Sequence, residues 1–322
     1  MEEYVLVSLF DGYSGAYEAA KRVKSLKISK CYASEIDKHA IKISKKNHPE
    51  IIHLGDVRDL VYSSDVPEST EKDIILIGGS PCQDLSIAGK RAGLKGEQSG
   101  LFFEYVRALE ELKPKYFIFE NVASMKNSDR DTISNILGVE PIMIDSALVS
   151  AQRRRRYYWT NIKGVQEPKD KKINLKDIVH ENTWADRDKV SDIIKKYIVP
   201  FDKTLKILDK ETQRGKVGYF GTNSQGQRVY NIHGKSVTLS ASGGRGAKTG
   251  LYLFGCITPD RINKIEGYIR KLTPVECERL QTLPDGYTEG VSDTQRYKML
   301  GNGFTVDVIA HILSFIPIQD LL

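Results

Sequence analysis

The stretch Ile74-Ile75-Leu76-Ile77-Gly78-Gly79-Ser80-Pro81-Cys82-Gln83 is the key to this chain, because it joins an apolar run directly to a lone thiol. The four apolar residues predict a buried parallel strand. The glycines and the proline that follow predict a sharp, stiff turn with Cys82 at its tip. A thiol in that place suits attack on a substrate, although a free cysteine is by itself most often a small buried hydrophobe.

The first half of the chain alternates short apolar runs with amphipathic ones. The expected strands cover residues 4–10, 31–34, 51–54, 73–77 and 116–119, and the expected helices cover 15–23, 38–47 and 101–112. Such alternation is typical of an α/β protein with a doubly wound, mostly parallel sheet. In these sheets ligands lie beyond the carboxyl ends of the strands. The polar residues expected at those ends are Asp11, Glu35, Asp56, Cys82, Glu120 and Asn121.

The second half of the chain has a different texture. Residues 169–201 are polar and predict helix, whereas residues 215–250 contain nine glycines and short β-like pieces such as 228–230. Tyr, Val and Leu are interleaved with these glycines, which favours a small, loop-rich β domain over a low-complexity linker. Helices are expected again over 270–283 and 296–316, and the apolar spacing of 306–313 predicts a helix packed on the main sheet.

Composition excludes several classes of protein. The chain has 322 residues, of which 40% are hydrophobic and 28% are charged, and it holds no apolar run of about 18 residues. Its first ten residues carry two acids and no basic segment, so neither a membrane span nor a secretory signal is expected. The four cysteines are scattered, which predicts no metal site, no disulfide framework and a reducing cytoplasm.

The distribution of charge is more informative than the net charge of +6, which by itself barely favours nucleic acid. Four consecutive arginines, Arg153 to Arg156, precede Tyr157-Tyr158-Trp159. Such a cluster suits phosphates and the faces of bases. The lysines at 169, 171 and 172 are more simply explained as a solvated face.

The acidic strand ends predict the kind of cofactor. The loop Phe10-Asp11-Gly12-Tyr13-Ser14-Gly15 opens a helix, but it is not a G-x-G-x-x-G phosphate loop. Glu35 and Asp56 suit ribose hydroxyls and an adenine amino group, since carboxylates accept hydrogen bonds from such donors. A nucleoside cofactor without phosphates, such as S-adenosylmethionine (AdoMet), therefore fits better than NAD.

A thiol, a carboxylic acid and two arginines in one pocket suit pyrimidine chemistry. Pyrimidine C5 is a poor nucleophile, but addition of a thiolate to C6 turns the ring into an enamine that can attack an electrophilic methyl group. The addition needs a hydrogen bond to ring N3, a task for Glu120. It also needs cations near the O2 carbonyl and the thiolate, and Arg154 and Arg156 alternate on an extended segment so that both can face the pocket.

Six ordered motifs carry a resemblance to a known family. They are FDGYSG at 10–15, GGSPCQDLS at 78–86, ENV at 120–122, QRRRR at 152–156, RKLTPVECERLQTLP at 270–284 and GNGFTV at 301–306. Through them the chain resembles the DNA cytosine-5 methyltransferases over nearly its whole length. The QRRRR run fits the Q-x-R-x-R pattern of that family and selects Gln152, Arg154 and Arg156.

The resemblance implies roles for individual residues. Cys82 would be the covalent nucleophile toward C6 of a flipped cytosine, and Glu120 would hold N3 and the exocyclic amine. Arg156 would contact O2, while Arg154 would support the loop and a neighbouring phosphate. The residues implied to line the AdoMet site are Phe10, Asp11, Gly12, Ser14, Gly15, Glu35, Ile36, Asp56, Val57, Pro81, Leu101, Asn302 and Phe304. Those implied to contact double-stranded DNA are Ser86, Gln225, Arg228, Thr238, Gly243, Gly244 and Arg245.

The resemblance also implies an architecture, that of a class I AdoMet-dependent methyltransferase with a smaller, loop-rich target-recognition domain. We expect a catalytic domain over residues 1–170, a recognition domain over 171–285 and a return to the catalytic domain over 286–322. The short interval between ENV and QRRRR, together with Asp11, is similar to the vertebrate de novo enzymes. The absence of a regulatory domain favours a stand-alone bacterial or phage enzyme acting as a monomer on DNA.

Two alternatives stay open. The first is the branch of the family that methylates a tRNA cytosine, against which the recognition segment of about 100 residues counts. The second is a catalytically silent DNA-binding homologue, against which the intact Cys82, Glu120, Arg154 and Arg156 count. Thymidylate synthases also use a Pro-Cys nucleophile on pyrimidine C6, but they lack these strand-end acids and the AdoMet-like loop.

Overall fold

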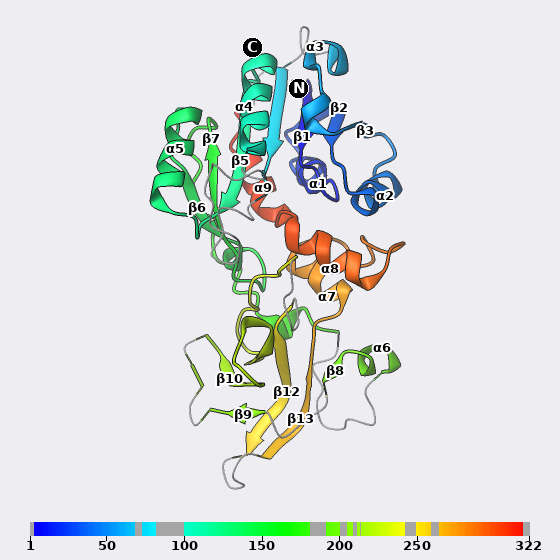
Figure 1. The fold of residues 1–322 in the computed structure, drawn as a ribbon, viewed down its shortest axis with the longest axis vertical. Coiled ribbons are helices and arrows are strands. Elements are labelled where there is room, and N and C mark those ends of the chain that lie inside the picture. The colour runs from blue at the N-terminus through cyan, green and yellow to red at the C-terminus, as the bar shows by residue number, and fades with distance from the viewer. Residues whose placement is uncertain are drawn as a thin grey trace. The chain divides into compact units, whose positions relative to one another are not determined.

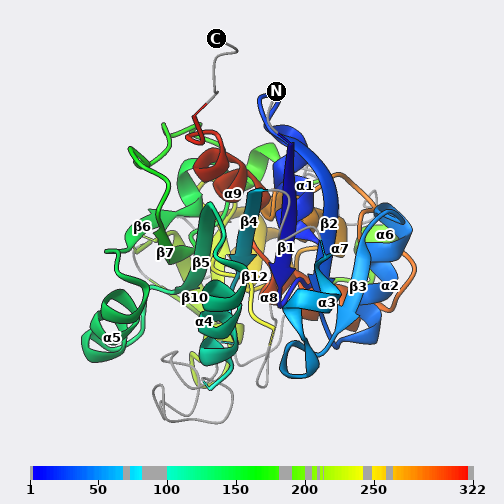
Figure 2. The ribbon, with the colours of Figure 1, turned by 90° about the horizontal axis from the view of Figure 1, so that it is seen from above.

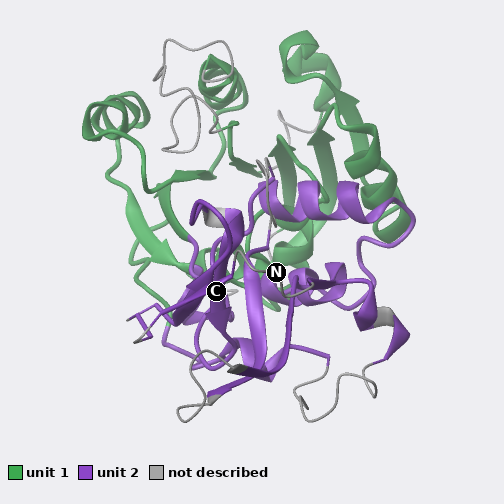
Figure 3. Ribbon diagram, turned by 60° about the horizontal axis from the view of Figure 1, so that its bottom comes forward, with its two compact units in different colours: residues 1–145, 155–168, 303–322 green, residues 146–154, 169–302 purple. Residues whose placement is uncertain are grey.

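The computed structural model divides the chain into two compact units, which Figure 3 shows in different colours. Unit 1 comprises residues 1–145, 155–168 and 303–322, and unit 2 comprises residues 146–154 and 169–302. The structure describes residues 3–67, 73–81, 100–180, 191–199, 205–208, 211–212, 214–241, 249–258 and 264–317. The predicted functional division at residues 170 and 285 stays a prediction.

Unit 1 is built on a twisted sheet with the order β3-β2-β1-β4-β5-β7-β6 (Figure 1). Its strands are β1 (Glu3–Leu9), β2 (Lys27–Ser34), β3 (Ile52–Gly55), β4 (Asp73–Gly78), β5 (Tyr116–Val122), β6 (Ile142–Asp145) and β7 (Arg155–Thr160). The first five strands pair in parallel, and β7 runs antiparallel to both β5 and β6. The predicted doubly wound, mostly parallel sheet is therefore confirmed.

Helices cover both faces of this sheet. They are α1 (Gly15–Arg22), α2 (Lys38–Asn47), α3 (Tyr62–Asp65), α4 (Leu101–Leu112), α5 (Asn127–Leu137) and α9 (Val306–Leu313). Figure 2 shows α1 and α9 together on one face, with α4 and α5 on the other. Small residues allow this packing, because the buried side of α1 is Gly15, Ala16, Ala19 and Ala20. Within the described part of the chain, no helix is long and apolar enough to cross a membrane.

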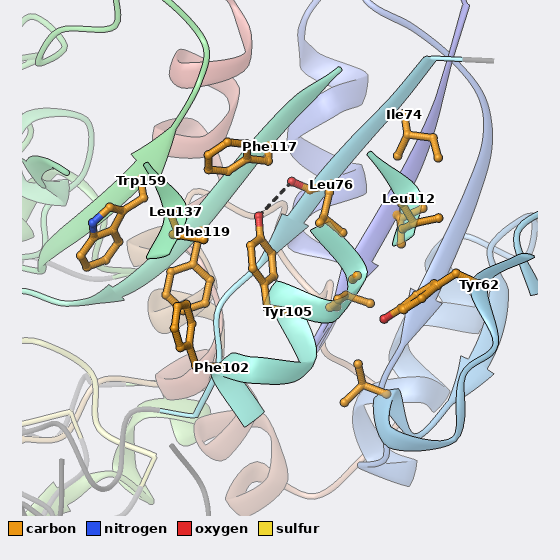
Figure 4. Close-up of a cluster of buried hydrophobic side chains, with 14 of the residues drawn as sticks. Tyr62, Ile74, Leu76, Phe102, Tyr105, Leu112, Phe117, Phe119, Leu137 and Trp159 are labelled. Atoms are coloured by element: carbon orange, nitrogen blue, oxygen red, sulfur yellow. Dashed lines mark hydrogen bonds between the residues drawn. The ribbon is translucent and has the colours of Figure 1, made fainter. Parts of the chain in front are cut away.

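One hydrophobic cluster of unit 1 lies between the sheet and α4 (Figure 4). Phe102 and Tyr105 project from α4 onto Phe119 of β5, with ring centroids 5.1 and 4.8 Å apart. The hydroxyl of Tyr105 lies 3.5 Å from the carbonyl oxygen of Leu76 on β4. Strands buried on both faces are apolar along their whole length, as Ile74 to Ile77 are, which is why the sequence predicted them well.

Unit 2 contains a second sheet, with the order β8-β13-β12-β11-β10-β9. Its strands are β8 (Ile198–Val199), β9 (Lys206–Ile207), β10 (Lys216–Tyr219), β11 (Arg228–Asn231), β12 (Leu251–Thr258) and β13 (Lys264–Arg270), and its helices are α6 (Asp192–Lys195), α7 (Pro274–Leu280) and α8 (Asp293–Asn302). The β-like piece at 228–230 is confirmed as part of β11. The described residues between 214 and 250 form two short strands joined by loops and turns, as the predicted loop-rich β structure requires.

The helix expected over 169–201 is wrong for the residues that the structure describes there. Residues 169–174 are extended or irregular, a single 3-10 turn covers Leu175–Asp177, and only α6 is α-helical. Polar composition suggested a helix, but this stretch lacks the apolar repeat that would bury one face of it. Leu175 is buried in the 3-10 turn instead, and backbone hydrogen bonds to Ile232 and Gly234 hold that turn.

A buried ion pair fixes α7 in unit 2. The guanidinium of Arg270 donates two hydrogen bonds of 2.7 Å to the carboxylate of Glu276, and both side chains are fully buried. Glu276 also closes a capping box with Thr273 at the start of the helix. Burial is the largest effect on the pKa of Glu276 and would raise it, but hydrogen bonds and the charge of Arg270 outweigh burial and lower it below its ordinary value.

We expect Glu276→Gln to destabilise unit 2 by about 3 to 5 kcal/mol, because it leaves Arg270 as an uncompensated buried charge. The matched control is Asp285→Asn, which removes the exposed partner of Arg279 and should cost about 1 kcal/mol or less. Urea unfolding followed by far-UV circular dichroism measures both changes. Equal losses in the two variants would contradict a special role for the buried pair.

Candidate active site

The loop after β1 is held in an unusual backbone conformation by a buried carboxyl group. Phe10, Gly12 and Ser14 have φ angles of 56°, 61° and 64°, a left-handed region that residues other than glycine rarely adopt. Asp11 is only 3% exposed and accepts hydrogen bonds from the hydroxyls of Ser8 (2.6 Å) and Ser14 (2.5 Å). These two bonds stabilise the turn and hold Asp11 inside it.

Glu35 is fixed beside this loop, at the carboxyl end of β2. One carboxylate oxygen accepts the backbone N–H of Gly12 at 2.8 Å. The other accepts the backbone N–H groups of Ile36 and Asp37, both at 2.8 Å. A carboxylate oxygen has two lone pairs, so the oxygen that meets Gly12 keeps capacity for a further donor. The Ile36 side chain is 70% exposed, and a Cβ placed on Gly12 would meet no atom within 4 Å, so this corner is open.

Asp56, at the carboxyl end of β3, already has partners within the protein, which the sequence did not suggest. Asp56 caps the 3-10 turn Val57–Asp59, and its carboxylate forms an ion pair with Arg58. Hydrogen bonds from Arg58 lower the pKa of Asp56. Val57 is buried in the apolar core cluster against which Phe10 and Leu101 also pack. The structure therefore brings these three predicted cofactor-lining residues into one cluster.

The two glycines that precede Ser80-Pro81-Cys82 serve close packing rather than turning. Neither Gly78 nor Gly79 has a positive φ, so the expected reason for glycine here is wrong. A Cβ on Gly78 would lie 2.8 Å from the ring of Tyr105, and a Cβ on Gly79 would lie 3.0 Å from the carboxylate of Glu120. Cys82 and Ser86 lie outside the described residues, which stop at Pro81 on this side.

Glu120 and Arg156 form the central pair of the site. They come from neighbouring antiparallel strands, where Val122 lies opposite Arg156 and Glu120 lies opposite Tyr158. Nε of Arg156 is 2.7 Å from a carboxylate oxygen of Glu120, and each side chain is only 12% exposed. A carboxyl group and a guanidinium thus lie side by side near the end of β5. The carboxylate lies next to Gly79, which precedes Cys82 by three residues.

Arg154 has different surroundings from Arg156. It belongs to unit 2, is 2% exposed and donates a hydrogen bond of 3.3 Å to the carbonyl of Gly301. Gln152, also buried in unit 2, accepts the backbone N–H of Leu239 at 2.9 Å. The structure thus brings Glu120 and Arg156 together within unit 1, while the first part of the QRRRR motif organises unit 2.

Two residues of the site had no role assigned to them from the sequence, although Asn121 was expected at a strand end. The Asn121 side chain, which is 1% exposed, lies 3.4 Å from the carbonyl oxygen of Ser80 and ties β5 to the segment leading to Cys82. The hydroxyl of Tyr13 donates to the carbonyl of Phe304, 291 residues later, and joins the first motif to the last. The signal for Asn121 was a polar residue inside ENV, whereas nothing local pointed to Tyr13.

The predicted DNA-contacting residues are only partly described. Nε of Arg228 donates to the carbonyl of Asn223 at 3.0 Å, and the Thr238 hydroxyl donates to the carbonyl of Arg153 at 2.5 Å. Gly243, Gly244, Arg245 and the side chain of Gln225 lie outside the described residues. Asn302, expected near the cofactor, is an exposed residue at the end of α8 in unit 2. The described residues hold no group of three or more His, Cys, Asp or Glu side chains suited to a metal ion.

Comparison with known proteins supports one family. A family model described as C-5 cytosine-specific DNA methylase matches residues 4–317. The chain is 30% identical to the type II methyltransferase M.HhaI of Haemophilus parahaemolyticus, with 95% of this chain and 92% of that protein covered. It is 31% identical to the type II methyltransferase M1.ScrFI of Lactococcus lactis subsp. cremoris, with 95% and 76% covered. The structure of the Entamoeba histolytica methyltransferase EhMeth is similar, with a TM-score of 0.72, 18% identity and 98% of each chain covered.

Asp11 should make stability depend on pH. Burial raises the pKa of Asp11 from 3.8 to about 7, against the hydrogen bonds from Ser14 and Ser8 that lower it. The folded state therefore binds more protons than the unfolded state between about pH 4 and pH 7, and the contribution of Asp11 to stability is lost as the pH rises through this range. We expect the free energy of unfolding of Asp11→Asn, relative to the wild type, to rise by about 2 kcal/mol from pH 5 to pH 7.

Denaturant unfolding at a series of pH values measures this difference, and comparison with the variant cancels the other titrating groups. Asp131→Asn, which changes an exposed carboxylate on α5, is the control, and its free energy of unfolding should depend on pH as that of the wild type does. If the free energy of unfolding of Asp11→Asn depended on pH as that of the wild type does, the raised pKa of Asp11 would be refuted.

Proposed function

Since this chain belongs to the family of C-5 cytosine-specific DNA methylases, we propose that it methylates C5 of cytosine within a specific duplex DNA sequence, with AdoMet as methyl donor. One observation carries the proposal. Glu120 and Arg156 are ion-paired at the carboxyl end of β5, and Gly79, three residues before Cys82, packs against that carboxylate. A pyrimidine edge placed there meets an acid and a cation, next to the segment that leads to the proposed nucleophile.

The residues on the cofactor side fit AdoMet. The open corner above Gly12, the carboxylate of Glu35 and the apolar residues Phe10, Val57 and Leu101 provide a hydroxyl-binding group and apolar walls. Phosphate-binding features are not needed for a nucleoside of this kind. When bound, AdoMet supplies an electrophilic methyl group. The buried Asp11 then acts by holding the loop, because both of its oxygens are engaged by Ser8 and Ser14.

In the proposed mechanism the target cytosine leaves the stack, because C6 cannot be reached inside a duplex. The thiolate of Cys82 adds to C6, and a bond between sulfur and carbon forms as the C5=C6 double bond is broken. Glu120 holds N3 and the exocyclic amine, and Arg156 stabilises the charge that develops at O2. C5 of the resulting enamine takes the methyl group as the bond between that group and the donor sulfur breaks. A water molecule then takes the C5 proton, the C5=C6 double bond re-forms, and the bond from C6 to sulfur breaks, which releases Cys82 as a thiolate.

Binding of the base requires Glu120 and Arg156 to exchange partners. In the free protein each is satisfied by the other at 2.7 Å. The exocyclic amine of cytosine donates to one oxygen of the carboxyl group, ring N3 accepts a hydrogen bond from the O–H of its acid form, and O2 accepts from the guanidinium. The base can therefore replace most of the interaction that it disrupts, so the pair is a preorganised site for a pyrimidine.

For the recognition of DNA we propose the residues of unit 2 that the motifs indicate. Arg228 and Gln225 suit guanine next to the target cytosine, because arginine pairs well with the O6 and N7 edge of that base. Arg228 is anchored through its Nε to Asn223, which leaves its terminal nitrogens to reach a base edge. Bisulfite sequencing of DNA methylated by the purified enzyme identifies the site.

The substrate test measures transfer of a labelled methyl group from AdoMet to duplex DNA and to tRNA in parallel. We expect label in cytosine C5 of the duplex and none above background in tRNA. Label confined to tRNA would overturn the proposed substrate in favour of the tRNA branch of the family. Absence of label in both, with intact DNA binding, would instead identify a silent homologue.

Covalent catalysis predicts that Cys82→Ala abolishes methylation by orders of magnitude in rate while DNA binding remains. Cys256→Ala is the matched control, since it removes a thiol from β12 of unit 2 and should leave the rate unchanged. Duplex DNA with 5-fluorocytosine at the target should trap a denaturation-resistant complex with the wild type, because fluorine cannot leave C5 as a proton does. Turnover by Cys82→Ala, or no trapping under turnover conditions, would refute the mechanism.

A further inference from the structure

Arg107 on α4 reaches across to the turn that follows β3. One terminal nitrogen of its guanidinium donates to the carbonyl of Leu60 at 2.9 Å, and the other donates to the carbonyl of Val57 at 2.8 Å. Val57 and Leu60 are both buried. Val57 is the first residue of the 3-10 turn that Asp56 caps, and Leu60 directly follows that turn. A single planar side chain therefore holds both ends of the turn.

Arg107 binds two backbone carbonyl groups that would accept N–H groups of a following turn if the helix continued. A three-residue 3-10 turn ends too soon to supply backbone donors for its last carbonyl groups, and such groups need other partners when they are buried. Two parallel N–H groups in a fixed plane meet this need in a way that one ammonium group does not. Lysine at this position would reach one carbonyl at a time.

Arg107 is itself held from several sides. Its Nε donates to Glu104 at 2.9 Å, and Glu111 lies 3.3 Å from a terminal nitrogen, so both neighbours on the helix orient the guanidinium. Its charged carbon lies 5.1 Å from the centroid of the Tyr62 ring, the first residue of α3. These contacts restrict the Arg107 side chain to one position.

The opposite face of α4 is locked to the strand that leads to Cys82. Tyr105 packs beneath Gly78 so closely that a Cβ there would lie 2.8 Å from its ring, and its hydroxyl meets Leu76 (Figure 4). Phe102 packs on Phe119 of β5. Through Arg107 and Tyr105, one helix thus fixes both the Val57 turn and the end of β4 within unit 1.

We propose that Arg107 is a positioning residue for the methyl donor: it does not touch AdoMet, but it holds the Asp56–Leu60 turn in the position that binds the adenosine part. The inference rests on the proposed function, because that function assigns Asp56 and Val57 to the cofactor site. Its effect is on cofactor affinity rather than on the reacting atoms. The expected signature is a change in AdoMet binding with little change in the maximal rate.

The experiment compares Arg107→Met and Arg107→Lys with the wild type. AdoMet affinity is measured by titration calorimetry on the purified full chain, and KM for AdoMet, kcat and Tm are measured in parallel. We expect Arg107→Met to raise the Kd and KM for AdoMet by roughly tenfold, within the range of up to about a hundredfold that misplacement of a binding group produces. Arg107→Lys should lie between it and the wild type, and kcat at saturating AdoMet and the KM for DNA should stay within about twofold.

The control is Arg130→Met on α5, which removes an arginine whose guanidinium pairs with the neighbouring Asp131 and should leave AdoMet binding unchanged. A second test adds Asp56→Ala. If Arg107 acts through the turn, the loss of affinity in Arg107→Met with Asp56→Ala is smaller than the sum of the single losses. Additive losses would contradict the proposal.

A purely structural role predicts a different result and would overturn the inference. In that case Tm and the fraction of active enzyme fall, but Kd and KM per active site remain those of the wild type. If Arg107→Met does not fold, the intermediate Kd of Arg107→Lys decides the question alone. Failure of the wild type to bind AdoMet would refute the proposed function itself. Equal AdoMet affinity of the wild type and the variants would refute only the role of Arg107.

Discussion

The ion pair between Glu120 and Arg156 is the interaction on which the proposed active site depends. Neither charge is stable at a nearly buried strand end without the other, and each holds the other in place at 2.7 Å. The pair also constrains the backbone around it. Gly79 must lie against the carboxylate, and Asn121, the residue after Glu120, reaches Ser80 in the same segment. Gly79 and Ser80, which lead toward Cys82, are therefore aligned on the strand that carries the acid.

The loop after β1, on the proposed cofactor side, differs in that its buried carboxyl group is held by hydroxyl groups instead of a guanidinium. Asp11 is satisfied by two hydroxyl donors, and burial keeps its pKa near 7 rather than 3.8. The hydrogen bonds offset the cost of three left-handed residues in the loop, which is about 1–3 kcal/mol for each non-glycine residue. One carboxyl group thus shapes a loop, while Glu35 beside it keeps an oxygen available to a ligand. Two acids close in space have different roles because their partners differ.

The sequence predicted the helices and strands whose formation depends on capping residues and on the spacing of apolar residues nearby in the chain. The bounds of α2 at 38–47 were predicted correctly, because Asp37 caps its first turn and its apolar positions repeat at helical spacing. The buried strands were equally clear. The alternation of Arg154 and Arg156 predicted that both face one pocket, which stays a prediction. What the sequence did not reveal is that their partners differ, Gly301 for the first and Glu120 for the second. The contact of Tyr13 with Phe304 was beyond local reasoning, since it joins residues 291 positions apart.

The glycines of the motifs show most clearly why the pattern could be found and yet be misinterpreted. A glycine can serve a left-handed turn or a close approach, and the sequence does not distinguish the two. Gly12 has the left-handed backbone, but Gly79 has not, and a Cβ on Gly301 would lie 2.5 Å from the backbone nitrogen of Ala241. In GGSPC and in GNGF, glycine is therefore required by what packs against it. Such a requirement is met only by the folded chain, so these glycines identify contacts between distant segments rather than local bends.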